Sequence, residues 1–195
     1  MSPAISRDSL LTLEAYAKAR PEMRTCVLEE KQLRRVFLGD HVLLLFENEF
    51  LIRYQIQEML RIEKTYEEAG IQDELDAYNP LVPDGSNLKA TMQIEYPDEA
   101  ERHRMLAQLK GIERQVWLRV GGCDPVFAIA DEDMPRENAE KTSAVHFLRF
   151  ELTPGVVAAL KKGASLSLGV DHENYKANTG ALAGPVRASL LSDLA

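Results

Sequence analysis

The longest helical pattern in the chain lies in FENEFLIRYQIQEMLRIEKTYEEAGIQDELDAYN (residues 46–79), which also holds its densest group of polar side chains. Asn48 suits the N-cap position of a helix over residues 48–67, because its side-chain oxygen can accept a hydrogen bond from the first turn. At about 100° per residue, one stripe of this helix is apolar and is expected to face a core. The stripe contains Ile52, Ile56, Met59, Leu60 and Tyr66, with Leu51 and Ile62 at its edge.

Two polar residues, Gln55 and Glu63, share this apolar stripe. A buried amide or carboxylate without a partner costs roughly 1 to 3 kcal/mol, so both side chains require hydrogen bonds. One interpretation is that they bond to the backbone or to an arginine and fix the packing. The other is that they line a pocket together with Glu58, which lies near the stripe boundary. The outward side is expected to hold Arg53, Gln57, Arg61, Lys64 and Glu68.

The segments on either side of this helix predict further helices and one buried strand. Ser6 or Asp8 can cap a first helix that ends before Pro21, and a second helix follows it. Residues 36–46 form a nearly unbroken apolar run with a bend at Gly39-Asp40, which indicates a strand covered on both faces. Gly70 is the expected helix stop, and residues 71–78 are expected to form a short helical turn.

Beyond the loop at residues 82–86 the pattern becomes strand, helix, strand, and it does so twice. The first unit covers residues 88–120, with Asp98 and Glu101 as a capping box, and the second covers residues 146–170, with Thr153-Pro154 starting its helix. A strand at residues 126–130 and a polar loop lie between them. The sequence therefore predicts an α+β fold in which N-terminal helices and one strand pack with a mixed sheet. A ferredoxin-like arrangement is one topology that two such units build.

The length of 195 residues favours a single domain, 1–195, with 82–86 as the one candidate sub-boundary between a helix-rich part, 1–81, and the strand-helix-strand part, 87–195. Its 23 basic and 31 acidic residues give an acidic protein of net charge −8, which argues against a nucleic-acid partner. The longest apolar stretch is far too short to cross a membrane, and no signal-peptide pattern is present. We therefore expect a soluble cytoplasmic protein with reduced cysteines.

The sequence motifs of common enzyme and metal sites are absent or weak. The chain has no Gly-x-Gly-x-x-Gly, Walker, Gly-x-Ser-x-Gly or His-Glu-x-x-His motif, and none of its four histidines has a glutamate three residues before it. No metal ligand set and no cofactor are predicted. His146 is expected to be a core histidine. His172, between Asp171 and Glu173 at the end of a strand, is either an exposed histidine without a role or part of a site.

Several stretches of the chain resemble a bacterial family called domain of unknown function thirty-five hundred and one. They are RRVFLGDHVLLLFEN, QIQEMLRIE, AGIQDELDAYNPLVP, KATMQIEYPDEAER, VHFLRFELTP and LGVDHENY, in that order. Genes of this family often lie beside those for rubrerythrin and an iron–sulfur oxidoreductase, so the resemblance implies a role near redox or peroxide metabolism. It supplies no catalytic residues.

Two functions remain open from the sequence. The first is a binding or accessory module, with a rubrerythrin or an iron–sulfur oxidoreductase as the partner that the resemblance implies. The second is an enzyme whose small polar pocket is lined by the helix at residues 48–67. For either, the candidate pocket residues are Gln55, Glu58, Glu63 and His172. The oligomeric state is not predicted.

Overall fold

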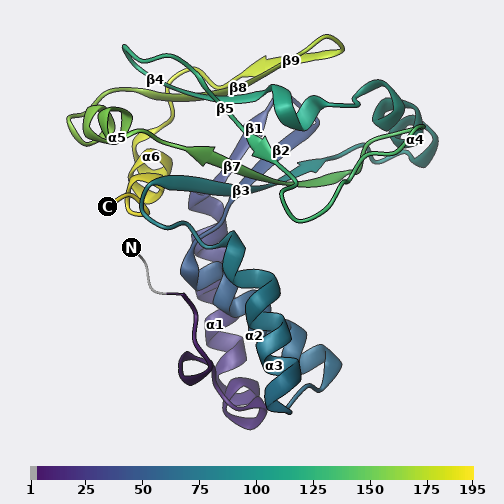
Figure 1. The fold of residues 1–195 in the computed structure, drawn as a ribbon, viewed down its shortest axis with the longest axis vertical. Coiled ribbons are helices and arrows are strands. Elements are labelled where there is room, and N and C mark those ends of the chain that lie inside the picture. The colour runs from purple at the N-terminus through teal and green to yellow at the C-terminus, as the bar shows by residue number, and fades with distance from the viewer. Residues whose placement is uncertain (1–3) are drawn as a thin grey trace.

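The computed structural model describes residues 4–195. Two antiparallel β-sheets face each other, and an arm of three helices extends from one side of them (Figure 1). The predicted α+β class is confirmed. No helix among residues 4–195 is both long enough and apolar enough to cross a membrane.

The arm consists of α1 (Leu13–Leu33), α2 (Glu49–Glu63) and α3 (Glu68–Tyr78), with short 3-10 turns at Arg7–Ser9 and Asn79–Leu81. The helix α2 lies in the middle of the arm and buries side chains on two sides. On one side Ile52, Ile56 and Leu60 pack with α3 and the N-terminal segment, and on the other Leu51 and Tyr54 pack with α1. The arm therefore has apolar clusters of its own.

The larger sheet has the order β1-β2-β3-β7-β6, and the smaller one has the order β5-β4-β8-β9. The larger is built from β1 (Arg35–Leu38), β2 (Val42–Phe46), β3 (Asn87–Ile94), β7 (Val145–Glu151) and β6 (Ile129–Ala130). The smaller is built from β5 (Val126–Phe127), β4 (Val116–Val120), β8 (Leu166–His172) and β9 (Tyr175–Asn178). Alternating side chains from both sheets form the main core, which includes Leu44, Met92, Leu118 and Leu168.

Three further helices close the ends of this sandwich: α4 (Glu99–Gln108), α5 (Pro154–Lys161) and α6 (Gly184–Leu191) (Figure 1). The side chains of Asp98 and Thr153 cap α4 and α5, as predicted. The expected mixed sheet of two β-α-β units is wrong, because all strand pairs are antiparallel and each unit divides its strands between the two sheets. The helix α4 connects β3 to β4, and α5 connects β7 to β8, so each helix links a strand of the larger sheet to a strand of the smaller one. The apolar faces of the two sheets can then pack against each other in one core.

The predicted bend at Gly39-Asp40 is confirmed, but the single strand expected over residues 36–46 is a hairpin of β1 and β2, and only β2 is covered on both faces. All five residues of β2 are buried, and Gly39 adopts φ +66° in the turn. A Cβ atom on residue 39 would lie only 2.6 Å from the Tyr175 hydroxyl oxygen. This hydroxyl donates a hydrogen bond of 2.6 Å to the Leu38 carbonyl. Glycine at position 39 thus allows the smaller sheet to close on this turn.

Three details of the arm differ from the sequence prediction. One helix, capped by Thr12, runs through Pro21, because packing against α2 compensates for the single backbone hydrogen bond that proline removes. The helix α2 ends at Glu63, where Lys64 takes the left-handed conformation, and Gly70 lies inside α3. Because α2 is shorter than expected, Tyr66 falls outside it and is exposed.

Arg34 joins the arm to the sandwich. It is fully buried at the end of α1, and its Nε and Nη2 donate to the carbonyls of Phe46 and Glu47 at 3.0 Å each. Its Nη1 donates to Ser189 in α6, and Nη2 also pairs with Asp193. One guanidinium therefore fixes the end of β2, and with it the position of Glu47, against the C-terminal segment.

Candidate functional site

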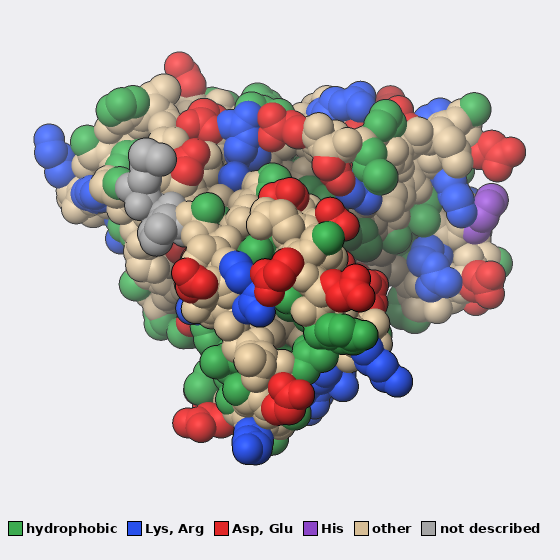
Figure 2. Space-filling model, turned by 60° about the horizontal axis from the view of Figure 1, so that its bottom comes forward, with side chains coloured by type: hydrophobic (Ala, Val, Ile, Leu, Met, Phe, Trp, Pro, Cys, Tyr) green, Lys and Arg blue, Asp and Glu red, His purple; other side chains and the backbone are tan. Residues whose placement is uncertain are grey.

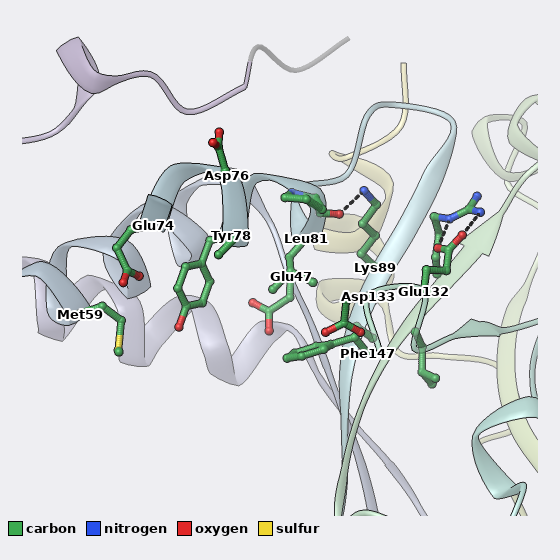
Figure 3. Close-up of a pocket in the computed structure, with 15 residues that line it drawn as sticks. Glu47, Met59, Glu74, Asp76, Tyr78, Leu81, Lys89, Glu132, Asp133 and Phe147 are labelled. Atoms are coloured by element: carbon green, nitrogen blue, oxygen red, sulfur yellow. Dashed lines mark hydrogen bonds and ion pairs between the residues drawn. The ribbon is translucent and has the colours of Figure 1, made fainter. Parts of the chain in front are cut away.

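A cavity of about 560 Å³ lies between the arm and the outer face of the larger sheet (Figure 3). We call it the arm–sheet cavity. On the arm side its walls come from α2, α3 and the turn Asn79–Leu81 that follows α3. On the sheet side they come from β3, β7 and the loop that holds Glu132 and Asp133. The lining combines seven charged residues with eight apolar or aromatic ones, among them Met59, Ala77, Pro80, Leu81 and Phe147. A volume of this size suits a small molecule.

Glu47 is the buried titratable group of this cavity. It follows β2 directly and is only 9% exposed. Its Oε1 accepts a hydrogen bond of 2.7 Å from the Thr91 hydroxyl on β3. Burial raises the pKa of Glu47, and this effect outweighs the hydrogen bond from Thr91 and the charges of Lys31 and Arg34, which lower the pKa.

The Glu47 carboxylate points into the space between the side chains of Tyr78 and Phe147 (Figure 3). Its second oxygen, Oε2, makes no hydrogen bond or ion pair with any residue between 4 and 195. A carboxylate oxygen has room for at least one further donor, so this atom is available to a molecule in the cavity.

A smaller recess of about 250 Å³ adjoins the cavity and shares Glu47, Tyr78, Leu81 and Phe147 with it. Gln55 of α2 and Lys31 of α1 line this recess. The central helix therefore contributes to the site through Met59 in the cavity and through Gln55 in the recess.

The two basic residues of the cavity wall are already bound to protein oxygens. The Lys89 ammonium donates to the carbonyls of Pro80 and Val82 at 2.6 and 2.9 Å, and burial lowers its pKa. The Arg149 guanidinium forms two hydrogen bonds, of 2.8 and 2.9 Å, to the Glu132 carboxylate and also pairs with Glu151.

Carboxylates outnumber basic groups around the cavity. Besides Glu47, the lining holds Glu74, Asp76, Glu132 and Asp133. Burial raises the pKa of Glu74, and the neighbouring charges of Glu63 and Asp73 raise it further. In the space-filling view, acidic side chains gather on the surface where the arm meets the sheets (Figure 2). The cavity thus has a negative electrostatic environment.

The four residues proposed from the sequence do not converge on one site. Gln55 lines the recess, and Glu63 is exposed and acts on the cavity only through its charge on Glu74. Glu58 faces α1, on another side of α2. His172 belongs to the smaller sheet and is buried, not exposed as one interpretation of the sequence expected, and its Nε2 lies 3.0 Å from the Lys110 carbonyl. The predicted placement of Glu63 inside the core is wrong, because α2 ends at this residue.

Glu58 stabilises the arm. Its carboxylate accepts hydrogen bonds from the Tyr16 hydroxyl at 2.6 Å and from Arg20 at 2.7 and 2.9 Å, with Arg61 nearby at 3.3 Å. The Arg20 guanidinium is the largest cause that lowers the pKa of Glu58, to about 2. These bonds tie α1 to α2, which is a packing role.

Gln57 was expected to face outward but is buried. Its side chain accepts a hydrogen bond of 2.7 Å from the Leu11 backbone N–H and lies 3.4 Å from the Leu11 carbonyl. The N-terminal segment covers this side of α2, and a helical stripe cannot predict such a second cover. Gln57 therefore anchors that segment.

His146 is the core histidine that the sequence predicts. Its Nδ1 lies 2.6 Å from the Asp131 carboxylate, and its Nε2 lies 3.0 Å from both the Thr142 hydroxyl and the Ser143 carbonyl. Thr142, His146 and Asp131 resemble a catalytic triad in their residue types. Because His146 and Thr142 are buried, a substrate has no access to them, and the group has a packing role. Within residues 4–195 no group of three or more His, Cys, Asp or Glu side chains could hold a metal ion.

Sequence reasoning missed Glu47, Thr91, Tyr78 and Phe147 as site residues. Glu47 lies between an apolar strand and the N-cap Asn48, which is an ordinary place for a solvated carboxylate. Only the pairing of β2 with β3 and of β3 with β7 brings it beside Thr91 and Phe147. A glutamate directly after a fully apolar strand was the one local signal available.

Comparison with known proteins places this architecture in a family. The family model described as "Protein of unknown function (DUF3501)" matches residues 4–194. The chain belongs to the DUF3501 family. This confirms the resemblance seen in the sequence. A crystal structure of a novel protein of unknown function from Burkholderia pseudomallei K96243 is 58% identical to this DUF3501 chain. It superposes with a TM-score of 0.93, over 99% of this chain and 100% of that chain. No curated protein matches the chain.

Proposed function

We propose that this DUF3501 protein is a binding module that holds a small, largely apolar molecule in the arm–sheet cavity. The observation that carries the proposal is the cavity itself, whose volume of about 560 Å³ is lined by apolar and charged side chains from segments far apart in the chain. Ligand sites typically combine such walls with a few polar groups and a titratable residue of perturbed pKa. Glu47 supplies that titratable group.

An enzymatic function has less support from this geometry. Covalent catalysis typically uses a nucleophile, a base within hydrogen-bond reach and a third group that orients the base. The Glu47 carboxylate and the Thr91 hydroxyl form only a pair, without such a third group among residues 4–195. Lys89, the other titratable group of interest, is held by two backbone carbonyls. These residues can bind and orient a molecule, which is what a binding module requires.

The role beside a redox protein, implied by the family resemblance, remains a prediction, as does the cytoplasmic location. A binding module can also serve a partner protein, so the two ideas are compatible. The test is co-purification with rubrerythrin or the iron–sulfur oxidoreductase of the same organism, both correctly loaded with metal, at low and at moderate salt. Failure to co-purify at both salt concentrations would count strongly against this partner.

Ligand-observed NMR with a library of small amphipathic molecules tests whether the cavity binds ligands. Two exposed alanines on α3 offer a matched pair of variants, because Ala77 lines the cavity and Ala69 does not. Ala77→Trp should fill the cavity and abolish binding, whereas Ala69→Trp should preserve it. Binding that is equal in both variants, or no binding to the parent protein, would contradict the proposal. Native mass spectrometry of untagged protein would then identify the natural ligand.

A further inference from the structure

We propose that the molecule bound in the arm–sheet cavity is a primary amine with an apolar body, and that the Glu47 carboxylate holds its ammonium group. This inference rests on the proposed function, because it names the class of ligand that the same cavity takes. It follows from the geometry of Glu47, from its aromatic neighbours and from the charges of the cavity wall.

The first argument is the free oxygen of a buried carboxylate. Glu47 is more than nine-tenths buried, Thr91 occupies its Oε1, and its Oε2 is unpaired among residues 4–195. Oε2 is not sealed inside the protein, so a donor that enters the cavity can reach it, and a titratable group placed in this way is typical of a binding site. An ammonium group supplies both the missing donor and the missing positive charge.

The second argument is the pair of rings on either side of Glu47. Tyr78 and Phe147 flank the carboxylate (Figure 3), and aromatic faces attract cations. Phe147 already does so within the protein, since the Arg136 guanidinium lies 4.5 Å from its ring centroid. The Tyr78 hydroxyl makes no hydrogen bond within residues 4–195 and offers a second acceptor for an ammonium N–H.

The third argument is that the basic side chains around the cavity are engaged elsewhere. Lys89 is bound by two carbonyls, and Arg149 is paired with Glu132 and Glu151. Arg136 pairs with Asp131 and Asp133, and Arg34 is bound in the α1–α6 junction. Lys31 lines the adjoining recess. Lys31 and Arg34 lower the pKa of Glu47 at longer range, but neither forms an ion pair with it, so a cationic ligand would be its direct partner.

The body of the ligand follows from the remaining walls. Met59, Ala77, Pro80 and Leu81 present aliphatic surface on the arm side of the cavity. Such surface favours a hydrocarbon chain or ring over a second charged group. Glu74 and Asp76 stand on the same side, so the aliphatic surface receives the hydrocarbon body while these carboxylates reinforce the preference for a cationic ligand.

Isothermal titration calorimetry with three probes that share a phenylbutyl body tests the inference: phenylbutylamine, phenylbutanol and 5-phenylpentanoate. Their head groups are cationic, neutral and anionic, respectively. We expect the parent protein to bind the amine at least about tenfold more tightly than the alcohol and the carboxylate least tightly. Glu47→Gln keeps the acceptor for Thr91 and the shape of the site, so it should reduce amine affinity to that of the alcohol and leave the alcohol unchanged. Lys31→Gln, which removes a competing cation, should strengthen amine binding.

Each other outcome overturns the inference, and the outcomes separate it from the proposed function. If the three probes bind equally and Ala77→Trp abolishes their binding, the cavity is a ligand site but not an amine site. If the carboxylate binds best, the cavity selects anions. If none of the probes binds while other library compounds bind in an Ala77→Trp-sensitive manner, the ligand class is wrong and the cavity function stands. If no compound binds at all, both proposals fail.

Discussion

The Thr91 hydroxyl donates a hydrogen bond of 2.7 Å to Oε1 of Glu47, across the pairing of β2 with β3. This bond holds one oxygen of a buried carboxylate and leaves the other directed into the arm–sheet cavity. It also lowers the pKa of Glu47 and so partly offsets the effect of burial. Thr91 is therefore a positioning residue for Glu47.

Replacement of Thr91 by valine should raise the pKa of Glu47 further, because the hydrogen bond to its charged form is lost. The carboxyl then ionises at a higher pH than in the parent protein, so the pH midpoint of phenylbutylamine binding should move upward. Titration calorimetry over a range of pH checks this. The control is Thr25→Val, at an exposed threonine of α1. An unchanged midpoint in Thr91→Val would show that Thr91 does not tune Glu47.

Glu47→Gln should stabilise the protein, and the gain should depend on pH. Because burial raises the pKa of Glu47 above its usual value of 4.5, ionisation opposes folding. Below pH 4.5 the carboxyl is neutral in both states and costs nothing extra. As the pH rises from there through the folded-state pKa, the parent protein loses stability relative to the glutamine variant. Denaturant unfolding of both proteins measures the difference. A loss of stability in Glu47→Gln near neutral pH would contradict this assignment.

Glu58→Gln should weaken the arm, with the opposite pH dependence. Arg20, Tyr16 and Arg61 lower the pKa of Glu58 from 4.5 to about 2, so its ionised form stabilises the fold above pH 4.5. Because the carboxylate is partly exposed, solvent screening limits this contribution to about 1 to 2 kcal/mol. The difference in unfolding free energy between parent and variant should shrink as the pH falls from 4.5 toward 2. Amine binding should persist, and its loss would mean that Glu58 belongs to the site.

Arg34→Met should cost about 3 to 5 kcal/mol, the range for breaking a buried ion pair. The change leaves Asp193 and the carbonyls of Phe46 and Glu47 without their donor. Asp193→Asn, which retains an acceptor for Arg34, should cost less. Denaturant unfolding distinguishes the two variants. A cost below about 1 kcal/mol for Arg34→Met would show that the arm does not depend on this junction.

Chelation should leave the thermal unfolding curve unchanged, because the sequence contains no closed set of Cys and His ligands. Differential scanning calorimetry with and without a chelator is the measurement. A fall of many degrees in Tm on chelation would reveal a structural metal and contradict this prediction.

Local features of the fold were predictable from the sequence. Asn48, Asp98 and Thr153 each cap a helix through hydrogen bonds to residues three positions further along, and such bonds depend on a few neighbouring residues alone. The unbroken apolar run of residues 42–46 correctly indicated a strand covered on both faces. These features do not require knowledge of distant parts of the chain.

Long-range features were not predictable in the same way. The two strand-helix-strand patterns look like one repeated unit, but their strands pair across the chain, as in the pairing of Thr91 with Phe147. Periodicity places Gln57 on the outward side of α2, yet the segment around Leu11 covers it. Glu47 becomes a cavity residue only after the arm and the sheet meet. The candidate site therefore required the tertiary structure.

The most direct test of the central claim is the pKa of Glu47, measured by carbon NMR of its side-chain carboxyl with and without saturating phenylbutylamine. Glu47→Gln identifies the signal, and Ala77→Trp serves as the control in which the amine cannot enter. We expect a pKa above the usual 4.5 in the free protein and a clear decrease when the amine binds, because a cation beside the carboxylate favours its charged form. A Glu47 pKa that is at or below 4.5 in the free protein, or that does not change with the amine, would contradict the claim that Glu47 holds a cationic ligand.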